Sequence, residues 1–514
     1  MFSWLRRFFV SSSVNKTAHA TSKGSKKNGS GANAQPRNYD INKGTKNLKM
    51  ESQNNAGVFS YAPTPLSITS LIKDISLMHP PGIAGDICNE MVEFEFRELA
   101  SLRPIVPIMI LSTIASELPK GRFKYNVYSI VTAPSAAGKE AHQSYLKSVL
   151  NKLGYERHVH EAPRSDKAII LDLLYAAATS AYIMDEGHVL FRSSFAAKAS
   201  NYEKNMADLL MQLKTANSFK LTGNLKRDLE ESLRPRIEKL TSRKKLDEET
   251  TNQLQELKAL YALLSEPIQS PHLSMISYST PSSVRFMFTE QGIATGFLGR
   301  FIYLRSGEKR AVLRYKDPSS LLEASKPIEA SDGIISRLQN IKTIVPPTFN
   351  SEAKMFLTEV TKYLDSDAIR NHPILGAIFA RGAEQILVIS TLLALEEGIV
   401  TRQMVGYSFK LFMNSIDECC NYLNAKEQGE ANALTQIVEE KVFQYSKKHG
   451  AASIAVIRNH IEKCSSAIRT KVCVDRDFLK KTLADMADAE MLVEVEPKSF
   501  IHAEFAENQN RSSV

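Results

Sequence analysis

The segment NVYSIVTAPSAAGKE, residues 126–140, decides the fold because it joins a strand to a helix through a loop that ends in Gly-Lys. Asn126–Thr132 is a largely apolar, strand-forming run, and a helix is predicted over His142–Leu153. A loop of this kind directs backbone N–H groups and a helix N-terminus toward phosphates. We therefore predict a nucleotide site, with Lys139 contacting the β- and γ-phosphates. The predicted site comprises Ala133, Pro134, Ser135, Ala136, Ala137, Gly138, Lys139 and Glu140.

The loop departs from the full phosphate-loop pattern, Gly-x4-Gly-Lys-Ser/Thr, at two positions. Ala133 replaces the first glycine, and Glu140 replaces the hydroxyl residue that normally holds Mg²⁺. Glu140 adds negative charge beside a triphosphate, so either Mg²⁺ binds it directly or the site is weakened. Ser144, one helical turn further on, is a poorly placed substitute.

Two carboxylates at the end of a second strand strengthen the nucleotide hypothesis. The apolar segment Ala181–Met184 runs into Asp185 and Glu186. This placement suits Mg²⁺ positioning by Asp185 and water activation by Glu186. The alternative is a turn with a helix cap. A third strand, Leu273–Tyr278, runs into Ser279, which would supply a polar group near the γ-phosphate.

Helical segments separate these strands, which predicts an α/β layered sheet that is mostly parallel. The expected organisation is a helical segment over residues 61–125, a core over 126–310 and a helical lid over 345–425. Leucines at helical spacing predict two charged helices in an insert over 225–266, consistent with a hairpin. The insert includes Lys244 and Lys245 as DNA-contact candidates, against the alternative of a solvated amphipathic hairpin.

The last segment, residues 430–505, has the pattern of a winged helix. Helices are predicted over Leu434–Lys447, from a cap at Ser453 through Ile461, and over Arg476–Ala489 with Asp475 as its cap. Two short strands follow around Pro497-Lys498. The alternative to DNA binding is a protein-contact domain. Its candidate DNA contacts are Arg476, Lys480, Lys481 and Lys498.

The basic charge of the chain is confined to its first residues. Residues 1–50 hold ten Lys or Arg and one acid, so they carry the whole net charge of +9, and the remainder is neutral. Residues 1–60 are predicted to be a disordered basic tail. The first residues also fit a transit peptide or a surface anchor. No apolar run is long enough to predict a membrane span, and the five cysteines show no CxxC spacing.

Several segments together, over about residues 78–425, resemble a family of P-loop ATPases associated with phages and mobile elements. Members are often described as a domain of unknown function or as primase-helicase-like, with broader kinship to AAA+ ring ATPases. The resemblance is carried by the order and spacing of HPPGIAGDICNEM, YSIVTAPSAAGKE, SDKAIILDLL, AYIMDEGHVLF, LLMQLKTANSFKLTGN, HLSMISYSTPSSVRFMF, GFLGRFIYL and FARGAEQILVISTLLAL.

The resemblance implies a P-loop NTPase fold of AAA+ or RecA type and a role for each matching residue. Lys139 matches the phosphate-loop lysine, Asp185 the metal-positioning acid and Glu186 the catalytic acid. A sensor residue is expected at Ser277, Ser279 or Thr280, of which Ser279 is favoured. Arg300 matches an arginine finger that completes a neighbour's site, and Arg381 resembles a second sensor. The alternatives are a surface salt bridge for Arg300 and a helix-face ion pair for Arg381.

These features lead to the expectation of an ATP-dependent DNA replication protein, a helicase or initiator. It would use ATP and Mg²⁺ and act on DNA as a homo-oligomer, with a hexameric ring implied. One alternative is a nucleotide-bound DNA-binding switch that recruits a host helicase with little hydrolysis; another is a mitochondrial ATPase with a transit peptide. Host replication proteins or a separate primase are further expected partners, in the cytoplasm of a bacterial or phage-infected cell.

Overall fold

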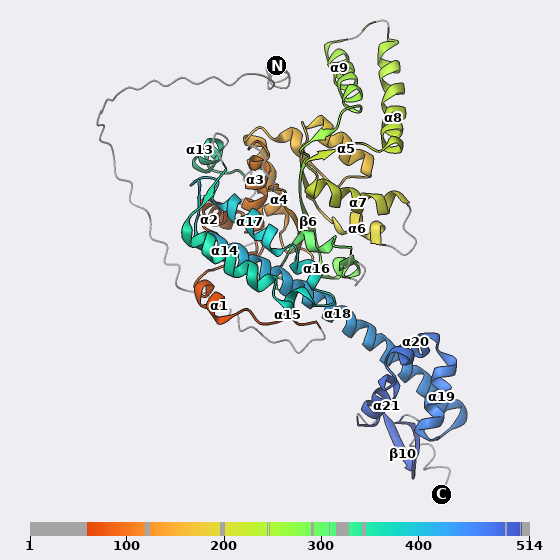
Figure 1. Cartoon of the computed structure of the whole chain (residues 1–514). Helices are drawn as coiled ribbons and strands as arrows, with labels where there is room; N and C mark the ends of the chain where they lie inside the picture. Colours follow the sequence, from red (N-terminus) through yellow and green to blue (C-terminus); the bar gives the residue numbers. More distant parts are fainter. Residues whose placement is uncertain are drawn as a thin grey trace. The chain divides into compact units, whose positions relative to one another are not determined.

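The computed structural model describes most of the chain after residue 58. It covers residues 59–118, 124–195, 201–243, 245, 247–288, 292–293, 295–307, 309–314, 328–341, 346–488, 491–503 and 505. The predicted basic tail, apart from residues 59 and 60, and Lys244 lie outside this part of the chain. Figure 1 shows the whole chain coloured along its sequence.

A five-stranded sheet with the order β2-β3-β6-β1-β7 forms the centre of the α/β fold, and every neighbouring pair in it is parallel. The strands are β1 (Tyr128–Thr132), β2 (Val159–His160), β3 (Thr179–Met184), β6 (His272–Ser279) and β7 (Phe301–Arg305). All residues of β1, β3 and β6 are buried, as expected of central parallel strands covered by helices. The three predicted strands are confirmed, and the two edge strands, β2 and β7, were not predicted.

Apolar helices pack against this sheet. Every residue of α3 (Ile105–Ala115) is buried, and the helix contacts β3, β6 and α4 (Glu140–Lys152). A helix that is apolar all round belongs inside a protein, because no face of it gains from contact with water. The helix predicted after the loop is confirmed, and it begins at Glu140 rather than at His142.

The remaining elements of this part of the chain follow in order. Before and within the sheet region they are α1 (Leu66–Ile72), α2 (Ile83–Met91), η2 (Val92–Phe94), η3 (Glu156–His158), α5 (Asp166–Tyr175), α6 (His188–Phe195), α7 (Asn201–Thr215), α10 (Pro281–Val284), η4 (Arg285–Met287) and η5 (Leu298–Arg300). In the region predicted as a lid and just before it they are α13 (Asp332–Ile341), β8 (Thr348–Phe349), α14 (Ser351–Leu364), α15 (Asp367–Arg370), α16 (Gly376–Phe379), α17 (Gly382–Leu393), β9 (Ile399–Val400) and α18 (Arg402–His449).

The insert consists of two helices that lie side by side, α8 (Gly223–Thr241) and α9 (Glu248–Leu263) (Figure 1). Leucines of both helices are buried, so the predicted spacing marked a real apolar face. A short antiparallel pair, β4 (Ser218–Phe219) with β5 (Ile268–Gln269), joins the two ends of the insert. The hairpin therefore leaves and re-enters the fold at one place.

The C-terminal segment has its own apolar core, formed by residues between Val438 and Leu492. Its elements after α18 are α19 (Ile454–Cys464), α20 (Ser466–Val474), α21 (Phe478–Asp488) and the antiparallel strands β10 (Leu492–Glu496) and β11 (Ser499–His502). Helix α20 was not predicted. The prediction that a helix begins at Arg476 was also wrong, because α21 begins at Phe478 and Asp475 instead accepts a hydrogen bond from the Asp477 N–H within the preceding turn.

The segment Gly376–Leu393, spanning α16 and α17, is long and apolar enough to cross a membrane by length and composition. Within the fold, 61% of it is buried, as the core helix of a folded domain would be. Among the residues that the structure describes, this segment is one weak candidate for a membrane-spanning helix, and no clear membrane span is found. All five cysteines are free thiols.

Candidate nucleotide-binding site

The phosphate-loop candidate connects the end of β1 to the start of α4 and is tied to the neighbouring strand. The Ala133 N–H donates to the Ser279 carbonyl at 3.1 Å. Ala136 and Gly138 both have positive φ, 55° and 92°, so the backbone turns sharply before the helix. A Cβ at Gly138 would meet no atom within 4 Å, so backbone conformation rather than space favours glycine there. Ser135 and Ala136 are exposed, which leaves the loop open to a ligand.

Lys139 stands at the N-terminus of α4 and points back to the sheet. Its Nζ donates to the Ser279 carbonyl at 3.1 Å. Burial lowers the pKa of Lys139 below its ordinary value. The carboxylates of Asp185, Glu140 and Glu186 oppose this shift, Asp185 most strongly. All three predicted acidic residues therefore lie within electrostatic range of the lysine.

The acid pair lies at the carboxyl end of β3, beside the loop. Both carboxylates are exposed. Asp185 Oδ1 accepts a hydrogen bond from Gln143 Nε2 of α4 at 3.3 Å and one from the Glu186 N–H at 3.1 Å. Glu186 itself has a φ of 49°, within the turn that ends the strand. The structure thus brings the two acids and the loop helix together, and Gln143 is a contact that sequence reasoning missed.

Ser279 links the loop to the acid turn, because β6 lies between β1 and β3. Ser279 is 2% exposed. The Oγ accepts from the His188 N–H at 3.2 Å and lies 3.3 Å from His188 Nδ1. Gly187 packs directly over the strand, since a Cβ there would lie 2.3 Å from Ser277 Oγ. His188 and Gly187 are further residues of the site that were not singled out from the sequence, although both follow the acid pair directly.

Glu140 is the first residue of α4 and is exposed. A carboxylate in the first turn is stabilised by the positive end of the helix dipole. The helix thus accepts a glutamate where the standard pattern has a hydroxyl. Ser144 is also exposed, on the next turn.

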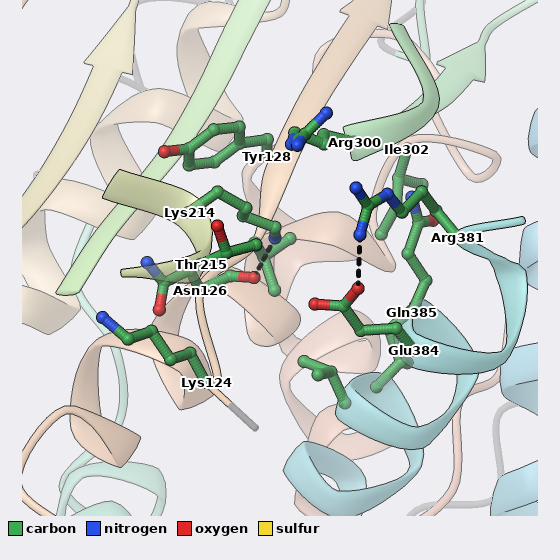
Figure 2. A pocket seen from close by; sticks show the side chains of 13 residues that line it. Lys124, Asn126, Tyr128, Lys214, Thr215, Arg300, Ile302, Arg381, Glu384 and Gln385 are labelled. Atoms are coloured by element: carbon green, nitrogen blue, oxygen red, sulfur yellow. Dashed lines mark hydrogen bonds and ion pairs between the residues drawn. The ribbon is translucent and has the colours of Figure 1, made fainter. Parts of the chain in front are cut away.

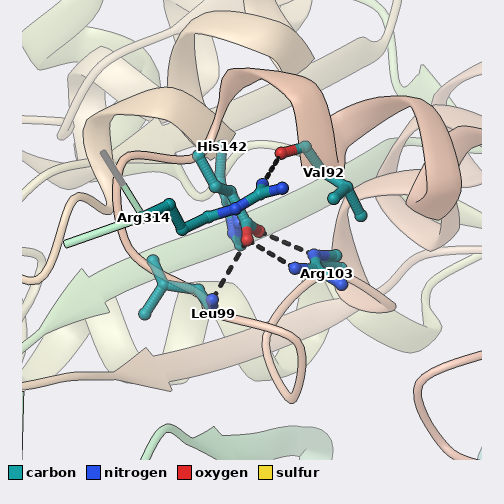
Figure 3. A network of polar contacts seen from close by, with 6 residues as sticks. Val92, Leu99, Arg103, His142 and Arg314 are labelled. Atoms are coloured by element: carbon teal, nitrogen blue, oxygen red, sulfur yellow. Dashed lines mark hydrogen bonds and ion pairs between the residues drawn. The ribbon is translucent and has the colours of Figure 1, made fainter. Parts of the chain in front are cut away.

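A buried ionic network fixes helix α4 one turn after the loop (Figure 3). Glu95 is 1% exposed, and its carboxylate accepts from Arg103 Nε at 2.8 Å and Nη2 at 2.6 Å. His142 Nε2 of α4 lies 2.7 Å from Glu95 Oε1, and the Leu99 N–H donates to Oε2 at 3.1 Å. Burial alone would raise the pKa of Glu95, but hydrogen bonds from Arg103 and His142 outweigh it and lower the pKa to about 2. Nearby, Arg314 Nη1 donates to the Val92 carbonyl.

Arg300 and Arg381 lie together, but away from the phosphate loop. Tyr128 at the start of β1 pairs with Phe301 at the start of β7, so Arg300 is level with the beginning of β1. The loop follows the other end of β1, about five residues or roughly 17 Å away along the strand. Arg381 precedes α17 and pairs with Glu384 at 3.5 Å. Arg381 lines the same cleft as Arg300 and lies beside Gly299, so in this chain it is near the amino ends of the strands and not beside the phosphate loop, where a second sensor was expected.

The DNA-contact candidates belong to two separate regions. Arg476, Lys480 and Lys481 are exposed around the start of α21. Lys498 occupies the β10–β11 turn with a φ of 64°, and its N–H donates to Glu494 Oε1 at 2.6 Å. In the insert, Lys245 is exposed between α8 and α9. Arg476 precedes α21, whereas Lys480 and Lys481 lie on it, so Arg476 does not belong to the helix predicted to carry all three.

No group of three or more His, Cys, Asp or Glu side chains is arranged to hold a metal ion in the part of the chain that the structure describes. Mg²⁺ characteristically uses one or two carboxylates together with substrate phosphates, so the Asp185–Glu186 pair fits that ion only with a nucleotide. Comparison with known proteins found no matching family model and no matching curated protein.

Proposed function

We propose that the chain is an ATPase that acts on DNA in the replication of a phage or mobile element, as a helicase or an initiator. The observation that carries the proposal is the meeting of Lys139, the acid pair and Ser279 at the carboxyl ends of adjacent parallel strands. Ligands of open parallel sheets bind at this edge. Strand β6 lies between β1 and β3, so Ser279 at its end stands between the loop and the acids. This position is the one expected of a sensor residue and supports the AAA+-like interpretation.

Each residue has a defined task in this proposal. The loop N–H groups and Lys139 hold the phosphates, and Lys139 exchanges its neutral carbonyl partner for phosphate oxygens. Asp185 would hold Mg²⁺, which would neutralise charge on the transferred phosphoryl group. Glu186 orients the attacking water and accepts its proton. Ser279, fixed by His188, contacts the terminal phosphate or the water.

The position of Arg300 supports an oligomeric enzyme. Arg300 lies too far from this chain's loop to touch a nucleotide held there, as the β1–β7 register requires. An arginine finger supplied by one subunit to its neighbour would account for that position. Such a finger contributes about 10³–10⁵ in rate. A homo-oligomeric ring is therefore part of the proposal.

DNA binding rests on the exposed basic residues of the C-terminal segment. Three helices, the end of α18 and a β-hairpin are consistent with a winged helix, with Lys480 and Lys481 on α21 and Lys498 in the wing. The insert, with Lys245 at its turn, offers a second contact.

A second candidate function, a nucleotide-bound DNA-binding switch with little hydrolysis, is favoured by Glu140 at the usual Ser/Thr position. ATP hydrolysis measured with and without DNA decides between the two. A helicase or initiator hydrolyses ATP faster when DNA is added, whereas a switch binds ATP with negligible turnover in either condition. Failure of the wild-type chain to bind ATP at all would exclude both functions.

A further inference from the structure

A cleft at the amino ends of β1 and β7 carries more positive than negative charge. Four cationic side chains, Lys124, Lys214, Arg300 and Arg381, line it together with one carboxylate, Glu384 (Figure 2). Arg381 forms an ion pair with Glu384 at 3.5 Å. Burial and the nearby Arg381 lower the pKa of Arg300, with Glu384 acting in the opposite direction. The cleft therefore holds unbalanced positive charge.

The cleft also contains buried hydrogen-bonding atoms that have no partner among the contacts of the described residues. They are Arg300 Nε, both side-chain amide atoms of Asn126, and Gln385 Oε1. Asn126 is 1% exposed and Gln385 is 8% exposed. Unsatisfied buried polar groups are costly and uncommon in folded proteins, and their concentration in one place indicates a missing ligand.

The basic groups are held in place by the fold. Lys214 Nζ donates to the Asn126 carbonyl and lies 4.8 Å from the centre of the Tyr128 ring. Arg300 Nη1 donates to the Gly296 carbonyl at 2.6 Å. Gln385 Nε2 donates to the Gly299 carbonyl at 2.7 Å, which ties α17 to η5.

Glycine at position 299 allows the two arginines to approach each other. A Cβ on Gly299 would lie 3.2 Å from the Ala377 carbonyl oxygen and 3.2 Å from Ile378 Cα. That spacing is tighter than an ordinary van der Waals contact, so η5 and α16 pack this closely because no side chain intervenes. The arrangement is preorganised, which lowers the entropic cost of binding.

We propose that this cleft is a second phosphoryl-binding site, in which Lys214, Arg300 and Arg381 jointly take a phosphate oxyanion, with Asn126 and Gln385 completing its polar lining. The free volume at its centre is about 20 Å³, room for about one water-sized group. A terminal phosphate oxygen fits that space and a nucleoside does not. Lys214 is thus a third phosphate ligand, in addition to the two arginines.

The phosphoryl group has two possible sources, a free anion or the nucleotide of a second copy of the chain. This chain's own loop is roughly 17 Å away along β1, so its nucleotide cannot supply the group. The second-copy source rests on the proposed function, since it requires ATP on the neighbour's loop. The free-anion source does not.

Lys214 gives the cleft a characteristic pH dependence. Burial lowers the pKa of Lys214 to about 7, with Glu384 raising it and Arg300 lowering it further. The charged or titratable groups that line the cleft with it are Arg300, Arg381, Glu384, Lys124 and Tyr128. The lysine is protonated below pH 7 and loses its charge above it. Anion affinity should therefore fall as pH rises from 6 to 8, and an anion that binds should be accompanied by proton uptake near pH 7.

The first test isolates the cleft by disabling the loop. The full-length Lys139→Ala chain is titrated with sodium tripolyphosphate at low ionic strength by calorimetry. We expect the Lys139→Ala chain to bind tripolyphosphate saturably. Adding Lys214→Met or Arg381→Gln should weaken this binding at least about tenfold, because each change removes one charge-assisted hydrogen bond. Lys139→Ala with Lys220→Met is the control, because Lys220 is exposed and does not line the cleft.

Two results would overturn the site: no binding by the Lys139→Ala chain, or equal binding by the Lys214→Met, Arg381→Gln and Lys220→Met combinations. Thermal unfolding of each variant shows whether it is folded. Lys214→Met and Arg381→Gln are two independent changes, so one unstable variant does not prevent the comparison.

The second test identifies the source of the phosphoryl group. Lys139→Ala chains, with an intact cleft, are mixed with Lys214→Met chains, with an intact loop. Faster ATP hydrolysis by the mixture than by the two components separately supports a neighbour's nucleotide. No gain, with tripolyphosphate binding retained, overturns the second-copy source and leaves a free-anion site. If the wild-type chain binds no ATP, the proposed function fails, while the tripolyphosphate titration still decides whether the cleft binds phosphate.

Discussion

Lys139 and Ser279, 140 residues apart in the chain, meet where the lysine Nζ donates to the serine carbonyl at 3.1 Å. The same carbonyl accepts from the Ala133 N–H at 3.1 Å. Lys139 forms no ion pair among the contacts of the described residues, although Asp185 and Glu186 influence its pKa. An incoming phosphate therefore displaces a neutral acceptor and does not have to break a salt bridge.

Lys139→Ala should lose ATP affinity. Removing the lysine deletes one charge-assisted contact with the phosphates, which is expected to cost about 1.5–3 kcal/mol, or more than tenfold in Kd. Equilibrium binding of a fluorescent ATP analogue measures this. Lys147→Ala is the control, because Lys147 lies on the same helix and makes only an exposed ion pair with Glu161 at 3.4 Å. Equal affinity for Lys139→Ala and wild type would remove the basis for the phosphate loop.

Glu186→Gln should bind ATP and fail to hydrolyse it. The amide keeps the shape of the side chain and cannot accept a proton, and general-base catalysis typically contributes about 10²–10⁴ in rate. Single-turnover hydrolysis and ATP binding are measured on the same preparation. Glu161→Gln, an exposed carboxylate beyond η3, serves as the control. Turnover at the wild-type rate would mean that another group activates the water.

Glu140→Ser restores the usual residue at the start of α4. Relief of charge repulsion beside the triphosphate should lower the Mg²⁺ concentration needed for half-maximal hydrolysis by about fivefold to tenfold, equivalent to about 1 kcal/mol. A magnesium titration of the ATPase rate gives the value. A higher Mg²⁺ requirement in Glu140→Ser would show instead that the Glu140 carboxylate is itself a metal ligand.

The Glu95 network should make stability depend on acid pH. The folded-state pKa of Glu95 is about 2, below the ordinary value of 4.5, so the folded protein prefers the ionised carboxylate. This contribution is fully present above pH 4.5 and is lost as pH falls toward 2. Removing one partner of a buried pair costs roughly 3–5 kcal/mol, so Glu95→Gln should lower Tm near neutral pH.

Denaturation followed between pH 2.5 and 7 checks the Glu95 prediction. The wild-type protein should lose stability across pH 4.5 to 2.5, and Glu95→Gln should lose less over the same range. Glu93→Gln is the matched control, since Glu93 is the neighbouring acid in η2 and no member of the network. Parallel pH profiles for the wild type and Glu95→Gln would show that the carboxylate is not ionised in the folded state.

Lys480→Ala with Lys481→Ala should weaken DNA binding and its salt dependence. Each lost phosphate contact lowers the slope of log K against log salt by about 0.9. Fluorescence anisotropy at several salt concentrations measures affinity and slope together, on a cognate site and on random DNA. Lys354→Ala with Lys362→Ala, two exposed changes on α14, is the control. An unchanged slope would mean that α21 does not contact DNA.

The central strands could be predicted from the sequence because each is an apolar run followed by a polar turn. Strand β2 could not, since it is only Val159–His160. Strand β7 (Phe301–Arg305) was not predicted, and its place beside β1 at the edge of the sheet follows from tertiary pairing that the sequence around it does not indicate. Helix α20 was missed because it is only nine residues long and Ile468 alone of its apolar residues is buried.

The individual residues of the site could be predicted from the sequence, but the contacts between them could not. Lys139, Asp185 and Ser279 stand out because of where their strands end. The hydrogen bond from Gln143 to Asp185 depends on how the start of α4 is placed relative to the turn after β3, which no local pattern encodes. The position of Arg381 depends likewise on the close contact of α16 with η5, which Gly299 permits and which is visible only in three dimensions.

The strand order β2-β3-β6-β1-β7 also governs when the site can form during synthesis. Both sheet partners of β1, the strands β6 and β7, come later in the chain. The loop is therefore synthesised long before Ser279 of β6, to which it is hydrogen-bonded. At about 5–20 residues per second, the ribosome takes roughly 7–28 s to travel the 140 residues from Lys139 to Ser279. For that time the apolar β1 segment has no strand to pair with, and a chain interrupted before His272 would contain the Gly-Lys loop but no site.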